Sequence, residues 1–179
     1  ISADSLAFSY FSSFNLPVTI LRPFNTFGPR QSNRAIIPTI ITQIANFRKK
    51  IKLGNLTTTR DYTYIDDTVM GFVNCISSKD INGKTINLGT GNEYSGVPVL
   101  KIISNLMKIN TSYKQDNKRF RPIKSEVHRL VSDNKLAKKL IKWKPQYAGK
   151  KGFETALTKT INWYLDQENL RNFITDYNL

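Results

Sequence analysis

The chain has 179 residues, 40% of them hydrophobic, which fits one domain or a large piece of one and argues against a disordered chain. The formal net charge of +14 favours anionic partners, namely nucleic acid, a membrane surface or a phosphorylated small molecule, and its sign alone does not choose among them. No window approaches about 18 consecutive apolar residues and no secretory leader pattern is present, so we expect a soluble, cytoplasmic protein.

Helical and strand patterns alternate in the first part of the chain. Residues 2–14 carry apolar side chains at helical spacing and predict an amphipathic helix. Residues 17–23 form a short β-branched run that suits a buried parallel strand, and a loop of Asn, Gly, Pro and Arg follows at residues 25–30. Four isoleucines in one stripe then predict a helix over residues 36–47.

The middle of the chain repeats this alternation. Residues 51–54 and 60–64 are predicted to be strands. A helix follows directly, with Asp66 or Asp67 as its expected N-cap. Residues 84–91 then read as a strand that runs into glycine.

The last part of the chain is mainly helical. Helices are predicted over residues 97–107, 134–141 and 151–176, and a less regular basic segment occupies residues 113–130. Because strands alternate with helices along the chain, the sequence predicts α/β architecture with at least some parallel sheet.

The sequence contains no complete catalytic set. Gly89 and Gly91 follow a predicted strand, but Tyr94 stands where the third glycine of a dinucleotide-binding loop belongs. His128 is the single histidine and lies in a basic polar stretch, while the single cysteine, Cys75, is expected in the core. We therefore predict no catalytic residue, no disulfide and no metal site.

One pair of residues matches the spacing of a catalytic Tyr-x-x-x-Lys. Tyr147 and Lys151 have this spacing, and the chemistry requires both on one helical face so that the lysine lowers the pKa of the tyrosine. Pro145 and Gly149 disfavour a helix there, so we interpret the match as coincidence.

Arginines and asparagines at the ends of predicted strands are the remaining candidates. Asn25 and Asn87 lie near strand ends, where open α/β sheets bind ligands, and Arg60 and Arg121 could each hold a phosphate. Together these four side chains would suit a diphosphate. Taken singly, the arginines also fit surface ion pairs and the asparagines fit turn or strand-end positions.

Four segments in order carry a family resemblance. They are "LPVTILRPFNTFGPRQSNRAIIPTIITQI", "IKLGNLTTTRDYTYIDDTVMGF", "TINLGTGNEYS" and "RFRPIKSEVHRLVSDNKLAKKLIKWKP". In this order they resemble the C-terminal half of the extended short-chain dehydrogenases/reductases that act on nucleotide sugars. Within that family the chain is most similar to the NAD-dependent nucleotide-sugar 4,6-dehydratases, particularly those of the legionaminic acid type.

The resemblance implies roles for individual residues near the cofactor and the diphosphate. Pro23 and Phe24 match the segment that passes the nicotinamide ring, so NAD is the implied cofactor. Asn25 matches a residue that contacts the nucleotide diphosphate, and Arg60 matches the phosphate-binding arginine. The implied ligand is a nucleotide-diphosphate sugar.

Further positions match the part of the family site that holds the nucleoside. Ile51 and Leu53 belong to the short strand that lies beside the base. Asn87 and Arg121 match further contacts to the nucleotide, and Glu126 falls where related enzymes place an acidic group near the ribose.

The resemblance also implies how the chain is organised. Residues 1–24 would be the last helix and strand of a Rossmann domain, and residues 25–179 would be mostly the substrate-binding domain, with strand 85–89 returning to the Rossmann sheet. The catalytic Tyr-x-x-x-Lys and the glycine-rich cofactor loop of the family would precede residue 1. We therefore expect a C-terminal fragment that is inactive alone, from a full-length enzyme that forms a homodimer.

Two other functions stay open at this point. In the family's dehydratases NAD takes a hydride from sugar C4, water is eliminated across C5 and C6, and the hydride returns to C6, whereas a nucleotide-sugar 4-epimerase shares only the oxidation. A basic nucleic-acid-binding module is the alternative of another class, and it predicts binding that weakens steeply with salt. The ordered motifs favour the nucleotide sugar over nucleic acid or a membrane.

Overall fold

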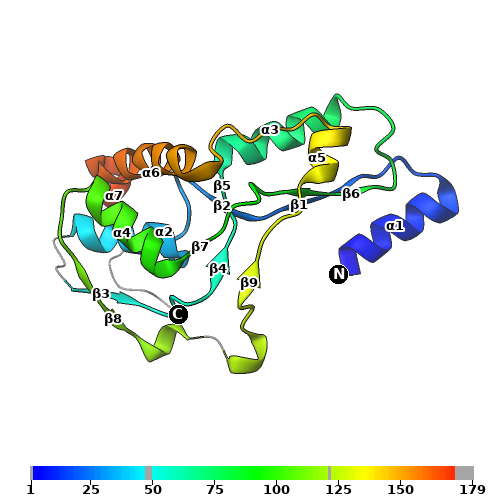
Figure 1. The fold of residues 1–179 in the computed structure, drawn as a ribbon. Helices are drawn as coiled ribbons and strands as arrows, with labels where there is room; N and C mark the ends of the chain where they lie inside the picture. The colour runs from blue at the N-terminus through cyan, green and yellow to red at the C-terminus, as the bar shows by residue number, and fades with distance from the viewer. Residues whose placement is uncertain (1, 47–49, 121, 172–179) are drawn as a thin grey trace.

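The structure is a computed structural model that describes residues 2–46, 50–120 and 122–171. The helices within these residues are α1 (Ser2–Phe14), α2 (Ile36–Ala45), α3 (Ile65–Ile76), α4 (Gly96–Leu106), α5 (Lys135–Leu140), α6 (Gly149–Leu165) and α7 (Gln167–Arg171), with two 3-10 helices, η1 (Asn117–Arg119) and η2 (Ile123–Ser125). The strands are β1 (Ile20–Pro23), β2 (Asn25–Phe27), β3 (Lys50–Leu53), β4 (Thr59–Arg60), β5 (Tyr62–Tyr64), β6 (Thr85–Leu88), β7 (Tyr94–Ser95), β8 (Ser112–Gln115) and β9 (Arg129–Leu130). Helices and strands alternate along the chain, which confirms the predicted α/β class (Figure 1).

One end of the molecule is built on a pair of parallel strands, β1 and β6 (Figure 1). Pro23 lies opposite Leu88, so the two strands end at the same edge. On this pair Ile86 and Leu88 join Trp143 in a buried cluster with α5. Helix α3 approaches closely because it carries Gly71 here, where an added Cβ would lie 2.6 Å from Cδ1 of Leu88.

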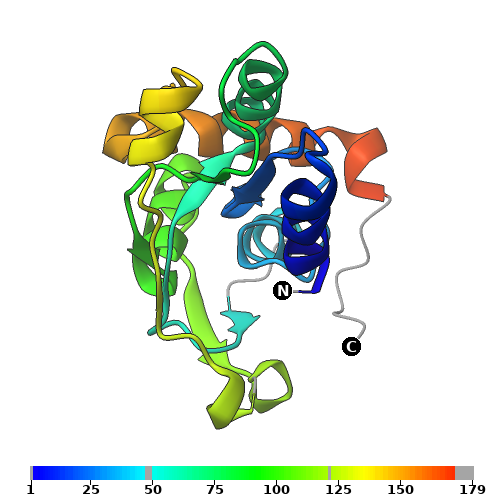
Figure 2. The same ribbon diagram turned by 90° about the vertical axis from the view of Figure 1, so that its right-hand side faces the viewer.

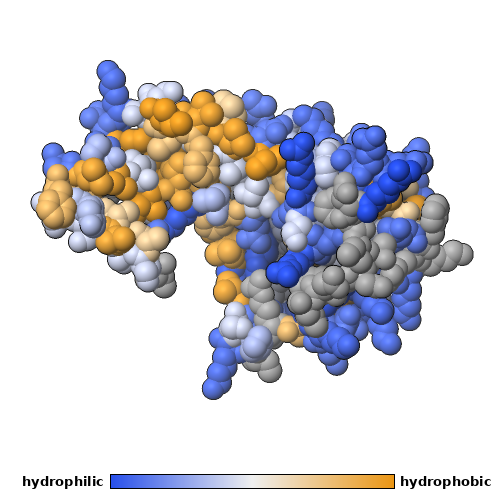
Figure 3. All heavy atoms as spheres, turned by 180° about the vertical axis from the view of Figure 1, so that it is seen from behind, coloured by the Kyte–Doolittle hydropathy of each residue, from blue (hydrophilic) through white to orange (hydrophobic). Residues whose placement is uncertain are grey.

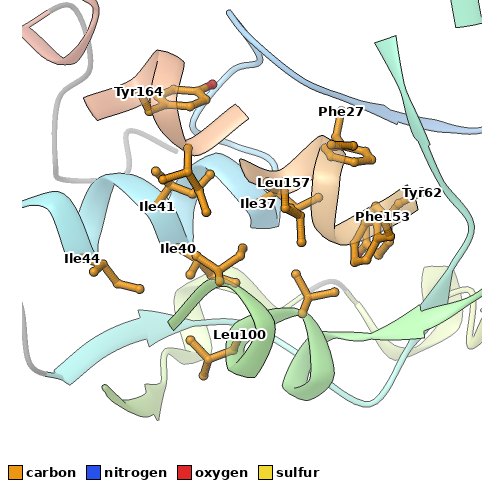
Figure 4. Close-up of a cluster of buried hydrophobic side chains, with 14 of the residues drawn as sticks. Phe27, Ile37, Ile40, Ile41, Ile44, Tyr62, Leu100, Phe153, Leu157 and Tyr164 are labelled. Carbon is orange, nitrogen blue, oxygen red and sulfur yellow. The ribbon is translucent and has the colours of Figure 1, made fainter. Parts of the chain in front are cut away.

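Helix α2 is at the centre of the other end (Figure 4). Its four isoleucines, Ile37, Ile40, Ile41 and Ile44, are each no more than 1% exposed. They pack between α4 and α6, whose Phe153 lies in the same cluster. The predicted stripe is therefore the main core of this end, and burial of each such side chain contributes about 1.5–3 kcal/mol.

Gln43 joins α2 to strand β3 through its side-chain amide. Its Nε2 donates to the backbone oxygen of Lys52 at 3.0 Å, and its Oε1 accepts from the backbone N–H of Lys52 at 2.8 Å. The glutamine is only 1% exposed, yet its side chain has partners at both ends. It therefore pairs with one edge of β3, while β8 pairs in parallel along β3 through Ile51 and Tyr113.

Short strands connect the two ends. Strand β2 pairs in parallel with β5, which places Asn25 opposite Tyr62. Strand β4 pairs in parallel with β9 and antiparallel with β7, so the chain through β9 runs beside β4 (Figure 2).

Apolar side chains stay exposed on α1 and α3, and Figure 3 shows apolar side chains gathered in the left-hand half of the molecule in that view. On α3 they are between 45% and 86% exposed and comprise Val69, Met70, Phe72, Val73 and Ile76. None of the residues of α1 is buried. Helix α1 is held against β1 by an ion pair between Asp4 and Arg22.

The predicted N-cap of α3 is wrong. The N-cap position is Tyr64, and both aspartates lie in the first helical turn. The carboxylate of Asp67 instead accepts the backbone N–H groups of Gln146 at 2.7 Å and Tyr147 at 3.0 Å. The local pattern predicts that the Asp67 carboxylate caps the helix, but in the fold it binds the backbone of a distant segment instead.

Two predicted elements are each divided by an aspartate. The strand predicted over residues 60–64 is interrupted at Asp61 and forms β4 and β5. The last predicted helix ends at Leu165, because Asp166 is extended and its carboxylate accepts the N–H of Glu168 at 3.0 Å, as an N-cap does for α7. The remainder of that predicted helix lies outside the described residues.

Over the stretch of chain that the structure describes, no helix has both the length and the apolar character needed to cross a bilayer.

Candidate functional site

A cleft of about 880 Å³ lies between the ends of the short strands. Its walls come from the start of β2, the loop before α2, the end of β3, strand β4 and residues 118–120, 122 and 126. A volume of this size is within the range of sites that bind small molecules. The cleft is therefore the candidate functional site.

Four of the residues singled out in the sequence line this cleft. Asn25, Leu53, Arg60 and Glu126 come from β2, β3, β4 and the segment before β9, and the fold brings them together across as many as 101 positions of sequence, from residue 25 to residue 126. The set comprises an amide, an apolar side chain, a guanidinium and a carboxylate. Such a set can contact the phosphates, the hydroxyls and an apolar ring of one ligand.

Arg60 and Glu126 form an ion pair inside the cleft. Nη2 of Arg60 lies 3.2 Å from Oε1 of Glu126, and the two side chains are 13% and 11% exposed. Nη1 of Arg60 also donates to the backbone oxygen of Thr59 at 2.8 Å. The guanidinium is therefore held in one orientation from two sides.

The backbone of β4 fixes the position of Arg60. The N–H of Thr59 donates to the backbone oxygen of His128 at 2.9 Å, and the N–H of Asp61 donates to that of Leu130 at 3.0 Å. Across the sheet, Arg129 donates to Glu93 at 2.9 Å, and this bond and one from the Thr59 hydroxyl lower the pKa of the Glu93 carboxyl. Three strands thus support the arginine.

Asp61 joins β4 to two neighbouring loops. Its Oδ1 accepts from the backbone N–H and the hydroxyl of Thr90, at 2.9 and 2.7 Å. Its Oδ2 accepts from the N–H groups of Gly91 at 2.8 Å and Ser132 at 3.1 Å. Because the side chain is fully buried, this carboxylate depends on all four donors. In the sequence Asp61 is simply an aspartate within a strand pattern, so nothing in its neighbourhood predicts that it joins two loops.

The structure does not bring the other predicted residues into the cleft. The side chain of Ile51 is fully buried in the core. Asn87 is turned toward the segment before α5, where its Nδ2 donates to the backbone oxygen of Asp133 at 3.4 Å. Pro23 and Phe24 lie at the carboxyl end of β1, and the N–H of Phe24 donates to the oxygen of Leu88 at 2.9 Å.

Arg121 lies outside the described residues. Sequence reasoning missed three other cationic residues that line the cleft, Arg34, Lys118 and Arg119. Arg119 lies 3.6 Å from Asp116, and its side chain is 12% exposed. The cluster of basic residues around Phe120 in the sequence could have indicated that Lys118 and Arg119 contribute to a binding site. These cations outnumber the carboxylates that line the cleft, so the site favours an anionic ligand.

Two further observations bear on the chemistry of the site. Burial raises the pKa of Tyr62, which lines the cleft, to about 12, so its phenol stays neutral at physiological pH. Tyr147 lies before α6 and its hydroxyl is paired with Nζ of Lys159, not Lys151. Within the described ranges, no group of three or more His, Cys, Asp or Glu side chains is placed to hold a metal ion.

The sequence matches the family described as GDP-mannose 4,6 dehydratase over residues 1–156. Among curated relatives, the human dTDP-D-glucose 4,6-dehydratase is 30% identical over 96% of this chain and 48% of its own length. The UDP-glucuronate 4-epimerase of Thermodesulfobacterium geofontis is 32% identical over 94% of this chain and 49% of that protein. The chain spans about half the length of these relatives.

Solved structures show the same fold. The UDP-glucuronic acid 4-epimerase of Bacillus cereus, solved with UDP-glucuronic acid and NAD, has a TM-score of 0.79 and 25% identity, covering 90% of this chain and 49% of that one. The dTDP-glucose 4,6-dehydratase of Bacillus anthracis, solved with NAD, has a TM-score of 0.79 and 26% identity, covering 96% of this chain and 51% of that one. Dehydratases and epimerases thus match about equally, and this chain belongs to the family of NAD-dependent epimerases and dehydratases that act on nucleotide sugars.

Proposed function

We propose that this chain is the substrate-binding portion of a nucleotide-sugar 4,6-dehydratase of the dTDP-glucose or UDP-N-acetylglucosamine type. The observation that carries the proposal is the cleft in which Asn25, Arg60 and Glu126 converge from three separate segments. Each has a more ordinary explanation when taken alone. Their convergence in one cationic cleft is what a nucleotide diphosphate requires.

The residues of the cleft would divide the ligand among them. The guanidinium of Arg60 presents parallel donors that suit a phosphate, and the amide of Asn25 can donate to a second phosphate oxygen. Leu53 supplies apolar surface for one face of the base, and Glu126 can accept from ribose hydroxyls. Arg34 and Lys118 raise the local positive potential of the cleft.

At the end of β1, Pro23 and Phe24 would border the nicotinamide ring of a bound NAD. Pro23 and Phe24 are apolar residues at the carboxyl edge of the β1–β6 pair, next to Asn25 in the cleft. Bound NAD would supply the hydride acceptor for the reaction. The loop at Gly89 and Gly91 does not serve as a phosphate cradle here, since the N–H groups of Thr90 and Gly91 donate to Asp61.

We further propose that this chain alone does not turn over substrate. Its described residues supply binding groups, and the exposed Tyr147–Lys159 pair is not part of the cleft lining. The acidic groups that line the cleft are the carboxyl of Glu126 and the phenol of Tyr62. The expected result is no conversion of dTDP-glucose or UDP-N-acetylglucosamine by the chain with NAD, monitored as the 4-keto product. Turnover by the isolated chain would contradict the proposal.

A 4-epimerase is the second candidate, because a UDP-glucuronate 4-epimerase is 32% identical over 94% of the chain. The two activities differ in product. A dehydratase removes water and yields a 4-keto-6-deoxy sugar, whereas an epimerase leaves the mass unchanged. Mass spectrometry of the product made by the whole protein to which this chain belongs would therefore decide between them.

The finer assignments stay predictions. They are the legionaminic acid type, the cytoplasmic location, the homodimer of the full-length enzyme and the division at residue 24 between Rossmann and substrate-binding parts. A role in cell-surface polysaccharide biosynthesis and the absence of nucleic-acid and membrane partners are also predictions.

Calorimetric titration with UDP and dTDP tests the binding role. We expect one site per chain, and we expect Arg60→Gln to weaken the affinity at least about tenfold, because a phosphate loses a charged pair of donors. Arg171→Gln, which removes the same charge at the exposed end of α7, is the control and should leave the affinity unchanged. Equal affinities in all three proteins would refute the role of Arg60.

The same titration addresses the nucleic-acid alternative. A nucleic-acid-binding module would take up single-stranded RNA with an affinity that falls steeply as salt rises, and UDP would not compete. Our proposal expects UDP binding that excess RNA does not displace.

A further inference from the structure

Strands β3 and β8 lie side by side as a two-stranded parallel sheet (Figure 1). One edge of this sheet is closed, because the side-chain amide of Gln43 bonds to both the N–H and the C=O of Lys52 on β3. The other edge is β8, whose four residues are all exposed and which, within the described residues, pairs with β3 alone. Edge strands of this kind present backbone N–H and C=O groups to which another strand can add.

The register of the pair shows which backbone groups of β8 point outward. Just beyond the strand, the N–H of Asp116 donates to the backbone oxygen of Leu53 at 2.8 Å. Successive residues of a strand turn their N–H and C=O groups to opposite edges, so Lys114 shares the direction of Asp116, toward β3. The backbone groups of Tyr113 and Gln115 therefore point to the outer edge.

A hollow of about 620 Å³ adjoins β8 on the side of α4. Tyr113 lies opposite Ile51, which is fully buried, so both side chains are on the inner face of the sheet, and Tyr113 lines the hollow. Another wall is one side of α4, on which Val97, Leu100 and Ser104 are three or four positions apart. An apolar side chain of an added strand therefore has room on this face.

Lysines surround this edge on both faces of the sheet. Lys101 and Lys108 line the hollow, and none of the described residues that line it is an aspartate or a glutamate. On the opposite face, Lys114 of β8 lies opposite Lys52 of β3, and both are exposed. Opposite charges on neighbouring strands stabilise their pairing and like charges destabilise it. The edge therefore favours a strand with acidic side chains on the face of Lys114 and apolar side chains on the face of Tyr113.

A second copy of this chain does not have that chemistry. Its own β8 would bring another Lys114 to this edge, and each copy has a formal net charge of +14. We propose that the outer edge of β8 is an interaction surface for an extended segment of a partner protein in which acidic and apolar residues alternate. The segment adds to β8 as a third strand and places apolar side chains in the hollow. The proposal does not depend on the function of the cleft, because no residue lines both the cleft and the hollow.

Fluorescence anisotropy of a labelled Glu-Val-Glu-Val-Glu-Val-Glu peptide tests the proposal with the native chain. We expect saturable binding that weakens as salt rises, because exposed charges are screened, and no displacement by UDP. The peptide with lysine in place of every glutamate should not bind. Absence of saturable binding of the acidic peptide at low salt and millimolar chain concentration would overturn the proposal.

Lys114→Glu tests the charge of the edge. It places a like charge beside the acidic residues of the added strand, so the peptide should bind at least about tenfold more weakly. Lys79→Glu makes the same change of charge at an exposed position between α3 and β6 and is the matched control. It should alter the affinity less than about twofold. An equal loss in both variants would mean that net charge alone attracts the peptide, and the proposal would fail.

Gln115→Pro tests the backbone of the edge. Proline removes an N–H that points outward, and edge strands accept proline at such positions because the ladder to β3 is kept. We expect at least about a tenfold loss of peptide affinity, whereas Gln115→Ala, which keeps the N–H, should bind as the native chain does. Far-ultraviolet circular dichroism checks that both variants are folded. Unchanged binding by a folded Gln115→Pro would refute the addition of a strand.

A last arm changes the peptide and needs no variant. N-methylation of all the valines, or of all the glutamates, removes the N–H groups along one edge of an extended peptide. One of these two peptides should keep its affinity for the native chain and the other should lose it, since only one edge pairs with β8. Equal affinities would overturn the proposal even if Gln115→Pro fails to fold. Self-association of the native chain that competes with the acidic peptide and is abolished by Gln115→Pro would assign the edge to a second copy, which also overturns it.

Discussion

Replacement of Asp61 by asparagine tests the buried carboxylate that joins β4 to two loops beside the cleft. The carboxylate accepts four hydrogen bonds, two at each oxygen, from Thr90, Gly91 and Ser132. Asparagine has one acceptor oxygen and turns the other position into a donor. The lower-energy orientation keeps the oxygen toward Gly91 and Ser132, because the Thr90 hydroxyl can turn to accept from the amide nitrogen whereas a backbone N–H cannot.

The magnitude follows from what this orientation loses. The N–H of Thr90 is left without an acceptor in a partly buried position beside the fully buried side chain of residue 61, which costs about 1–3 kcal/mol. The two bonds that survive lose the negative charge of their acceptor and weaken by about half. Relief from burying a charge offsets part of this loss. We expect Asp61→Asn to lower the free energy of unfolding by about 2–4 kcal/mol.

Urea denaturation followed by tryptophan fluorescence measures this change, since Trp143 is 1% exposed in the fold. Asp133→Asn is the control, because the carboxylate of Asp133 is 67% exposed and its partner Lys135 is 90% exposed, and exposed pairs contribute about 0–1 kcal/mol. A free energy of unfolding for Asp61→Asn within about 0.5 kcal/mol of the native value would refute the assigned role.

Three further substitutions test the packing and the titration of the fold. Lys108→Gly should raise the free energy of unfolding by about 0.5–1 kcal/mol in urea, because residue 108 follows the C-cap of α4 with a φ of 56°. Gly71→Ala should lower it by about 1–3 kcal/mol, since the new Cβ would stand 2.6 Å from Leu88, and Leu88→Val should restore part of the loss in the double variant. Burial raises the pKa of Tyr62 to about 12, above the unfolded value near 10, so its contribution to stability is complete below pH 10 and is lost as the pH rises toward 12. Tyr62→Phe should therefore flatten the alkaline limb of a plot of unfolding free energy against pH, and an unchanged limb would contradict this origin.

Local periodicity explains why much of the fold was predictable. The stripe of Ile37, Ile40, Ile41 and Ile44 predicts α2 because side chains three and four positions apart share one helical face, and the structure buries all four. The ends of helices were less predictable. The last predicted helix is interrupted at Asp166, whose carboxylate caps α7. This end was not predictable, because an aspartate can serve either as an exposed helical side chain or as a cap, and the sequence pattern is the same for both.

The candidate site shows the same limit at longer range. Asn25 and Arg60 stand out in the sequence, since an asparagine and an arginine at strand ends suit a phosphate wherever the strands meet. Ile51 and Leu53 share the buried face of β3, and Leu53, at the end of the strand, also lines the cleft, whereas Ile51 is enclosed in the core. Nothing near Asn87 in the sequence indicates that its amide bonds to Asp133.

The sequence by itself determined the α/β class, the principal helices and the family, because these depend on neighbours in the chain or on ordered motifs. The tertiary structure alone decided that Arg60 meets Glu126, 66 positions away, and that Asp61 holds two loops 29 and 71 positions away. Hydrogen bonds between distant segments form only when the sheet sets their register. Whether a carboxylate caps a helix, joins loops or faces a ligand is therefore decided by packing rather than by its local sequence.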